Sequence, residues 1–210
     1  MKAPMSLSLR VEGLGKRHGK NWIFRNLNFD VEAGDSLALL GANGSGKSSL
    51  LRTLCAFDPI SEGNIQWTTN EGDSPREHVP GLVSYCAPDQ SLIPDLTVLE
   101  HIAFHFEFRQ PCANTSAEDT LELALLQNKG QVRVRNLSSG MRQRLSLSLA
   151  FSTLSSAVFL DEPTSHLDEN GRRWFQDLMS KTRDGRTLIV ASNHNENEYP
   201  KGTRSIVLEP

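Results

Sequence analysis

The segment at residues 41–48 (GANGSGKS) restricts the possible folds of this chain more than any other feature. It matches the pattern GxxxxGK followed by Ser or Thr, in which a glycine-rich loop joins a strand to a helix. The preceding run, Ser36–Leu40, is too short for a helix and suits a strand buried on both faces of a parallel sheet. Residues 46–56, which follow, have a helical pattern. This order predicts a phosphate-binding loop (P-loop) at the edge of a parallel sheet.

The residue types in this loop explain how it would hold phosphate. Gly41, Gly44 and Gly46 allow the backbone to wrap until its N–H groups point at phosphate oxygens, and the helix N-terminus adds partial positive charge. We expect Lys47 to neutralise the β- and γ-phosphates of a bound nucleotide and the Ser48 hydroxyl to ligate Mg²⁺. The other loop residues expected to line the nucleotide are Asn43, Ser45 and Ser49.

Two acidic residues follow a second apolar run. Residues 157–160 predict another buried strand, and Asp161 and Glu162 come directly after it. Ligands bind at the carboxyl ends of strands in open α/β sheets. If this strand neighbours the one that ends at Leu40, Asp161 reaches the Mg²⁺ and Glu162 faces the γ-phosphate, where it accepts a proton from the attacking water.

Hydrophobic patterning predicts alternating strands and helices along the rest of the chain. Further strands are expected at residues 6–11, 23–31, 63–68, 82–86, 187–191 and 205–208, with an exposed loop or hairpin tip at 70–80. Helices are expected at residues 97–109, 116–127, 139–154 and 168–181, the third of them amphipathic. Such alternation implies right-handed crossovers and a mainly parallel sheet. Residues 97–136 interrupt it and indicate a helical insertion.

Polar residues mark three helix starts. Thr97 with Glu100 predicts a capping box, and Ser116 precedes acidic residues in the same way. Ser138, in the segment LSSGMRQR at residues 137–144, is a good N-cap, and the helix N-terminus that it opens can hold an anion.

The order of these motifs resembles that of the ATP-binding-cassette (ABC) ATPases. The P-loop is followed by LSSGMRQRL, the acidic pair, residues 165–168 (SHLD) and residues 192–194 (SNH), and the resemblance extends from Leu7 to about Leu208. It implies an α/β P-loop NTPase fold with a mainly parallel central sheet and an N-terminal antiparallel β-subdomain. It also implies a single domain over residues 1–210, with an inserted α-helical subdomain at about 88–153.

The resemblance also implies a paired arrangement. Two copies of the chain would associate head to tail, with Ser138 and Gly140 of one copy contacting the γ-phosphate of the ATP that the other copy holds. His194 matches the family's switch histidine, which positions the attacking water and Glu162, and Asp168 matches the loop that reports across the dimer interface.

This sequence departs from the family pattern in several places. The usual LSGGQ reads LSSGM, with Ser139 for the first Gly and Met141 for Gln, and His166 stands where a small residue is common. The Mg²⁺-ligating Gln of the family falls on Pro88 without a gap, and on Asp89 or Gln90 with one deletion; either side chain offers an oxygen to Mg²⁺.

The adenine base is the remaining part of the nucleotide. Where the family stacks an aromatic residue on adenine, this chain has His18, which stacks more weakly than Tyr. Nearby Trp22 is expected to pack in the core or at its rim.

Composition narrows the class of function. The chain has 22 Lys and Arg against 25 Asp and Glu, a net charge of -3, which argues against direct nucleic-acid binding. No apolar run is long enough to span a bilayer, and the N-terminus has no signal core. Three widely spaced cysteines suit reduced thiols in a cytosolic protein. The resemblance implies ATP hydrolysis to ADP and phosphate on a separate integral membrane subunit. Taken with these observations, it leads us to expect a cytoplasmic ATPase at the membrane surface.

The sequence leaves three alternatives. A soluble ABC-type ATPase acting on nucleic acid or ribosomes usually needs two cassettes or a long coiled coil. A P-loop kinase or GTPase would leave LSSGMRQRL and His194 unexplained, and no NKxD guanine-reading element is present. A degenerate, binding-only cassette is disfavoured because Lys47, Ser48, Asp161, Glu162 and His194 are all present. For the transporter hypothesis, residues 92–108 are expected to form the groove that receives a helix of the membrane partner.

Overall fold

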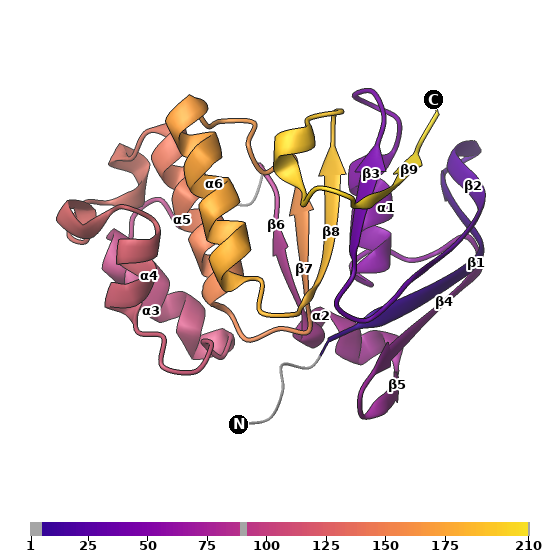
Figure 1. Ribbon diagram of the computed structural model, residues 1–210, viewed down its shortest axis with the longest axis horizontal. Coiled ribbons are helices and arrows are strands. Elements are labelled where there is room, and N and C mark those ends of the chain that lie inside the picture. Colours follow the sequence, from indigo (N-terminus) through magenta and orange to yellow (C-terminus); the bar gives the residue numbers. More distant parts are fainter. Residues whose placement is uncertain (1–5, 89–91, 210) are drawn as a thin grey trace. The chain divides into compact units, whose positions relative to one another are not determined.

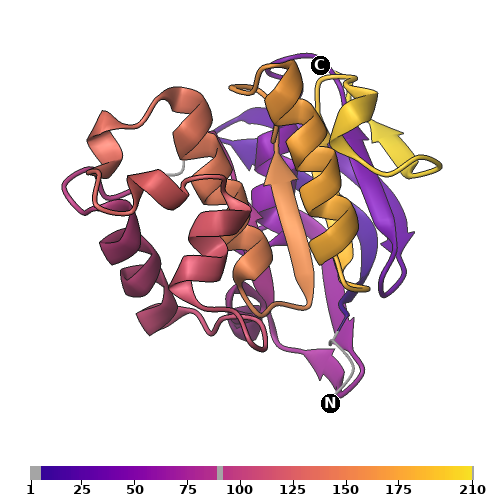
Figure 2. The ribbon, with the colours of Figure 1, turned by 60° about the vertical axis from the view of Figure 1, so that its left-hand side comes forward.

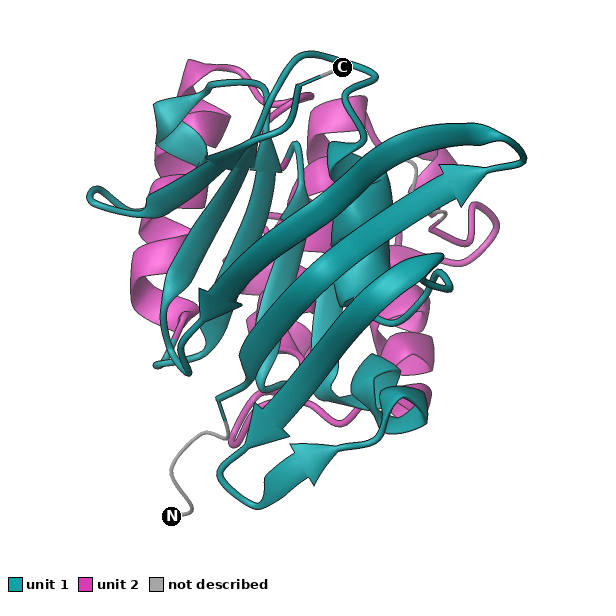
Figure 3. Cartoon of the chain, turned by 90° about the vertical axis from the view of Figure 1, so that its right-hand side faces the viewer, with its two compact units in different colours: residues 1–85, 155–162, 184–210 teal, residues 86–154, 163–183 magenta. Residues whose placement is uncertain are grey.

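The computed structural model describes residues 6–88 and 92–209. The chain divides into two compact units (Figure 3), each described here by itself. The sheet unit consists of residues 1–85, 155–162 and 184–210, and the helical unit of residues 86–154 and 163–183. The insertion expected at 88–153 falls within the helical unit, which also takes in residues 163–183.

The central sheet has five strands. Its order is β6 (Val83–Cys86), β7 (Ala157–Asp161), β8 (Thr187–Ser192), β3 (Ser36–Leu40) and β9 (Arg204–Val207), as Figure 1 shows. The pairs β7–β8, β8–β3 and β3–β9 are parallel. Every residue of β7 and β8 is buried, which is the reason that their sequences read as continuous apolar runs. The predicted parallel sheet is confirmed.

An antiparallel sheet of the order β2–β1–β4–β5 completes the strands of the sheet unit (Figure 3). Its strands are β1 (Ser8–His18), β2 (Asn21–Val31), β4 (Glu62–Thr69) and β5 (Gly72–Ser74). The predicted first strand was too short, because register shifts between Val11 and Leu14 and at Lys16 break the alternation that would have marked its second half.

Helix α1 (Lys47–Leu54) packs against β7 and β8 and buries Leu50, Leu51 and Leu54 completely. The indole Nε1 of Trp67 donates a 2.9 Å hydrogen bond to the Leu54 carbonyl, which ties the antiparallel sheet to the end of α1.

The stretch 70–80 is more ordered than the predicted loop: besides β5 it contains the 3-10 turn η1 (Arg76–His78) and the start of α2 (Val79–Leu82). The sheet unit also contains the 3-10 turn η4 (Glu196–Glu198).

Four helices and two 3-10 turns make up the described part of the helical unit. They are α3 (Val98–Phe108), α4 (Ala117–Leu123), η2 (Gln127–Lys129), η3 (Val134–Asn136), α5 (Ser139–Ser152) and α6 (Glu169–Thr182). The capping boxes predicted at Thr97 and Ser116 are confirmed, with Asp119 as the acidic partner of Ser116. The prediction that α5 is amphipathic was wrong: from Leu145 to Ser152 every residue is buried, serines included.

Cys55, Cys86 and Cys112 form no disulfide; Cys55 and Cys86 are buried and Cys112 is half-buried. Among the described residues, no helix combines the length and apolarity needed to cross a membrane.

A half-buried histidine, His105, makes the helical unit sensitive to acid. His105 Nε2 lies 2.8 Å from Thr153 Oγ1. Burial, with smaller effects of Arg109 and His101, lowers the pKa of His105 to about 4 from its ordinary value of 6.5. The unfolded chain therefore binds more protons than the folded chain between pH 6.5 and 4, so stability falls as the pH falls through this range.

We predict that the free energy of unfolding drops by roughly 2 kcal/mol from this group as the pH is lowered from neutral to 4. In His105→Gln the drop should be smaller, because glutamine does not titrate and can still hydrogen-bond Thr153. Urea denaturation of both proteins at several pH values measures this pH dependence of the free energy of unfolding. The matched control is His166→Gln, an exposed histidine of the same unit; equal pH slopes in both variants would contradict the prediction.

Candidate nucleotide-binding site

The P-loop connects the carboxyl end of β3 to α1 (Figure 1). Gly41, Gly44 and Gly46 have φ angles of 150°, 86° and 96°, in the region that favours glycine. A Cβ on Gly46 would lie 2.5 Å from Ile23 Cγ2, and one on Gly41 would lie 2.5 Å from the Leu208 carbonyl oxygen. The backbone conformation favours glycine at all three positions, and the close approaches favour it further at Gly41 and Gly46.

Lys47 is only 4% exposed and is held by the loop itself. Its Nζ donates hydrogen bonds of 2.8 Å to the Gly41 carbonyl and 2.9 Å to the Ala42 carbonyl. The buried Ser45 Oγ has no hydrogen-bond partner among the described residues. A fixed ammonium, an unpartnered hydroxyl and a loop of N–H donors fit a polyphosphate.

A cleft of about 350 Å³ opens in front of this loop. The residues that line it are Ile23, Asn43, Gly44, Gly46, Lys47, Ser48, Ser49 and Glu162. Six of these were predicted as P-loop contacts and Glu162 as the catalytic base, so the structure brings these predicted residues together. Ile23 was missed. The alternation of side chains along β2 could have pointed to Ile23, because it places this residue on the face opposite to Trp22.

Glu162 follows β7 with φ at 43°, an unusual backbone conformation for a residue with a side chain. Its N–H donates a 2.9 Å hydrogen bond to the Ala191 carbonyl of the neighbouring strand β8, which holds this conformation. Strand β7 does not neighbour β3, because β8 lies between them. The roles predicted for Asp161 and Glu162 assumed that these two strands are neighbours, and that assumption is wrong. The turn at Glu162 still brings its side chain to the cleft.

Asp161 is the last residue of β7 and is 6% exposed. Burial, followed by the negative charge of Asp161, raises the pKa of Tyr85. Asp161 does not line the cleft beside the P-loop, so its role as an Mg²⁺ ligand stays a prediction.

His194 lies in the turn after β8, between the carboxyl ends of the strands that carry the P-loop and Glu162. It is exposed, and its φ of 57° is again in the left-handed region. The turn is held by a 3.1 Å hydrogen bond from the Asn195 N–H to Ser192 Oγ. Two site residues, Glu162 and His194, thus have strained backbones that neighbouring hydrogen bonds hold in place.

His18 ends β1 and is exposed, opposite Asn21 in the hairpin. It does not line the P-loop cleft, and its stacking on adenine stays a prediction.

Trp22 is 37% exposed, and the Arg25 guanidinium lies 4.5 Å from the centroid of its ring. The tryptophan therefore packs against arginine at the surface of the antiparallel sheet.

The LSSGM segment lies in the helical unit, at the N-terminus of α5. Ser138 Oγ accepts a 3.2 Å hydrogen bond from the Met141 N–H, which confirms the predicted N-cap. A Cβ on Gly140 would lie 3.2 Å from the His166 carbonyl oxygen, so the glycine lets the first turn of α5 and the loop at His166 approach closely within the helical unit. Asp168 caps α6 by accepting a 2.8 Å hydrogen bond from the Gly171 N–H.

The predicted Mg²⁺ ligands lie only partly among the described residues. Asp89 and Gln90 lie outside the described residues, and Pro88 is half-buried. Within residues 6–88 and 92–209, no group of three or more His, Cys, Asp or Glu side chains is arranged to hold a metal ion. A hydroxyl such as that of Ser48 suits Mg²⁺, which is usually bound by few protein ligands together with substrate phosphates.

Comparison with known proteins agrees with this geometry. A family model described as "ABC transporter" matches residues 24–165. The chain is 35% identical over 189 residues to the cytochrome c biogenesis ATP-binding export protein CcmA of Rhodopseudomonas palustris (strain BisB5), covering 89% of this chain and 92% of that protein. It is 32% identical over 197 residues to the sulfate/thiosulfate import ATP-binding protein CysA of Mesostigma viride, where it covers 90% of this chain but only 56% of that protein.

The fold also matches solved structures. The dimeric structure of the ATP-binding cassette MJ0796 in a post-hydrolysis state, bound to ADP and Pi, superposes with a TM-score of 0.78 at 24% identity, covering 96% of this chain and 94% of the other. At this level of identity the likeness shows a shared fold.

Proposed function

Since the chain belongs to the ABC transporter family, as the match over residues 24–165 shows, we propose that it is the ATP-hydrolysing subunit of a transporter and works as a pair of cassettes on a separate membrane protein. The observation that carries the proposal is the cleft in which Lys47 and Glu162 lie together beside the P-loop. An ammonium and a carboxylate that line the same small cleft support a phosphate-binding role for Lys47 and a proton-accepting role for Glu162.

The chemistry follows from the positions of these groups. The P-loop N–H groups and Lys47 bind the β- and γ-phosphates, and Lys47 exchanges two carbonyl partners for charged oxygens, which form stronger hydrogen bonds. Glu162 accepts the proton of the attacking water, and His194 orients that water. Ser48 and Asp161, with Asp89 or Gln90, would hold Mg²⁺, which neutralises charge that develops on the phosphates.

A second copy of the chain completes the proposed site. Ser138 and Gly140 lie at the N-terminus of α5, where N–H groups and the helix dipole attract a phosphate. Pairing is supported by the dimeric form of the solved cassette with the same fold. The names of the curated relatives, an import and an export ATP-binding protein, support a peripheral position at the cytoplasmic face of a membrane.

The purified chain tests the proposal directly. We expect Mg²⁺-dependent ATP hydrolysis that a multi-spanning membrane protein encoded beside it stimulates. Stimulation by DNA or ribosomes with no effect of the membrane protein would instead support the soluble, non-transport alternative. Absence of any affinity for Mg·ATP would overturn both.

Two aromatic side chains mark the proposed membrane-facing surface. Phe104 and Phe108 are 45% and 73% exposed on α3, and their ring centroids lie 5.1 Å apart. Aromatic residues are frequent anchors of protein interfaces. They would contact a helix of the membrane subunit.

We predict that Phe104→Glu and Phe108→Glu each leave the basal ATPase rate within about twofold of the unmodified chain and weaken membrane-subunit binding at least tenfold, a loss on the scale of an interface hot spot. Co-purification and partner-stimulated ATPase activity measure it. Val207→Glu, at an apolar site of the sheet unit that is 57% exposed, is the control. Equal loss of binding in all three variants would contradict the assignment of this surface.

A further inference from the structure

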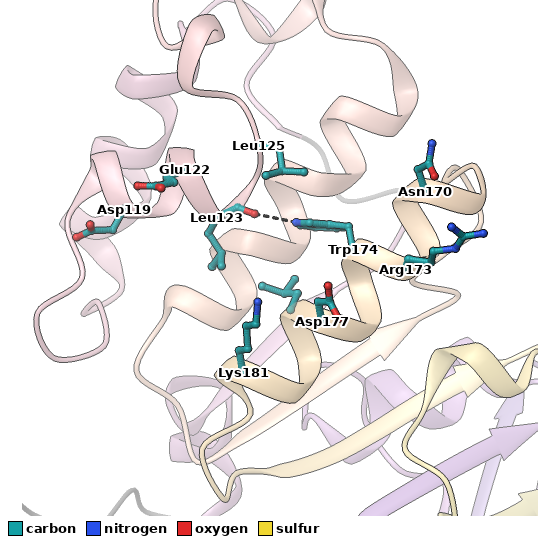
Figure 4. Close-up of a pocket in the computed structure, with 10 residues that line it drawn as sticks. Asp119, Glu122, Leu123, Leu125, Asn170, Arg173, Trp174, Asp177 and Lys181 are labelled. Carbon is teal, nitrogen blue, oxygen red and sulfur yellow. Dashed lines mark hydrogen bonds between the residues drawn. The ribbon is translucent and has the colours of Figure 1, made fainter.

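A second cleft, of about 660 Å³, lies within the helical unit between the end of α4 and the exposed side of α6 (Figure 4). It has the size of a ligand-binding pocket and contains no residue of the P-loop site or the LSSGM segment. The residues that line it are Asp119, Glu122, Leu123, Leu125, Asn170, Arg173, Trp174, Asp177, Leu178 and Lys181.

Leu125, at its edge, is in a conformation that its side chain disfavours. Helix α4 ends in hydrogen bonds from the Leu125 N–H to the Glu122 carbonyl and from the Leu126 N–H to the Leu121 carbonyl. This pattern requires a left-handed residue at position 125, where φ is 56° and glycine is usual. The turn sends Leu126, 1% exposed, into the core, but leaves the Leu125 side chain 54% exposed.

The fold therefore needs the backbone of Leu125 and not its side chain. Glycine or asparagine would make the same turn with less strain. An exposed leucine at this position costs stability and presents an apolar group beside the cleft.

Trp174 supplies a rigid apolar wall. Its indole Nε1 donates a 2.9 Å hydrogen bond to the Leu123 carbonyl, and Figure 4 shows the ring reaching from α6 toward the end of α4. Leu178, 2% exposed, lies one turn further along α6. A tryptophan whose orientation is fixed in this way loses little entropy when another side chain packs on it.

The charges around this apolar surface are mainly negative. Arg173 is engaged by Glu169, its Nε lying 3.4 Å from that carboxylate. Among the residues that line the cleft, this leaves three carboxylates, those of Asp119, Glu122 and Asp177, against one further cation, Lys181. Carboxylates next to an aromatic face favour a cationic occupant.

We propose that this cleft, the α4–α6 cleft, binds a protein segment in which an apolar side chain is flanked by Lys or Arg. The inference rests on the proposed function, which makes the membrane subunit the source of this segment. Cytoplasmic loops of membrane proteins carry an excess of Lys and Arg, so the membrane subunit offers such segments. The cleft is then a second attachment point, besides the surface at Phe104 and Phe108.

The test uses the full chain labelled with 5-fluorotryptophan, whose three tryptophans give separate ¹⁹F resonances. The probe is a 14-residue amphipathic helical peptide of Leu and Lys, and a Leu–Glu peptide of the same design is its counterpart. We expect the Leu–Lys peptide to shift the Trp174 resonance and leave those of Trp22 and Trp67 in place. The Leu–Glu peptide should produce no shift.

Two variants separate binding from folding. Leu125→Gly should bind the peptide at least tenfold more weakly while its unfolding midpoint stays equal or rises, because the left-handed strain is relieved. Glu122→Gln with Asp177→Asn should weaken binding by a similar factor and leave the Asp119 cap of α4 intact. The matched control neutralises two exposed carboxylates away from the cleft, in Glu107→Gln with Glu77→Gln.

Several results would overturn the inference. The peptide could shift Trp22 as much as Trp174, the control variant could lose as much affinity as the cleft variant, or the Leu–Glu peptide could bind equally well. Self-association of the chain that Leu125→Gly abolishes would also overturn it, since the occupant would be a second copy. If the peptide fails to bind while Mg·ATP is hydrolysed normally, only this inference is lost and the proposed function stands.

Discussion

The Glu162→Gln variant is expected to hydrolyse ATP at least about 100-fold more slowly than the unmodified chain, the scale of a lost general base. Glutamine has nearly the same shape but accepts a proton far less readily, so the attacking water loses its base. The strained turn at residue 162 is held by the backbone bond to Ala191, which the substitution keeps. Single-turnover hydrolysis of radiolabelled ATP measures the effect.

ATP binding by this variant should be unchanged, and the ATP-bound pair should accumulate, because hydrolysis no longer releases it. Size-exclusion chromatography with Mg·ATP detects that pair. Glu169→Gln, an exposed acidic residue in the first turn of α6, is the control and should hydrolyse ATP normally. Undiminished turnover by Glu162→Gln would remove Glu162 from the proton-accepting role.

The Lys47→Ala variant is expected to lose both ATP binding and turnover. A charged hydrogen-bonding group contributes about 1.5 to 3 kcal/mol, so the dissociation constant for ATP should rise roughly 10- to 150-fold. The loss of the bonds to the Gly41 and Ala42 carbonyls also loosens the loop that carries the N–H donors. Titration with a fluorescent ATP analogue measures the affinity.

Lys47→Arg separates charge from geometry. Arginine keeps the positive charge, but its planar group does not fit between two carbonyls that a compact ammonium contacts, so binding should be only partly restored. The exposed Lys20→Ala is the control for a general effect of charge. Normal turnover in Lys47→Ala would contradict the phosphate-binding assignment of the whole loop.

The sequence predicted best those features that neighbouring residues decide. The capping box of Thr97 and Glu100 closes within one helical turn, and the N-cap of Ser138 reaches only as far as Met141. The predicted strand Ser36–Leu40 matches β3 residue for residue, because a strand covered on both faces reads as a nearly continuous apolar run, here Leu37 to Leu40.

Prediction failed where distant segments determine the outcome. Helix α5 looks amphipathic in sequence, yet Ser148 and Ser152 are buried, since small hydroxyl side chains tolerate close packing that local patterning does not reveal. Strand β1 continues through Gly13 and Gly15 because its partners β2 and β4 pair with it on both sides. No pattern inside β1 records those partners.

The sequence alone determined the chemistry of the P-loop, since glycine, lysine and serine at fixed spacing can cradle phosphate only one way. It also determined that acidic residues end a buried strand. The tertiary structure decided which of these groups meet. Strand β8 lies between β3 and β7, so the P-loop and the acidic pair follow strands that are not neighbours. The left-handed turn at Glu162 nevertheless brings its carboxylate to the cleft beside Lys47. The pairing of β3 with β8 joins segments about 150 residues apart in the chain, and no local pattern encodes it.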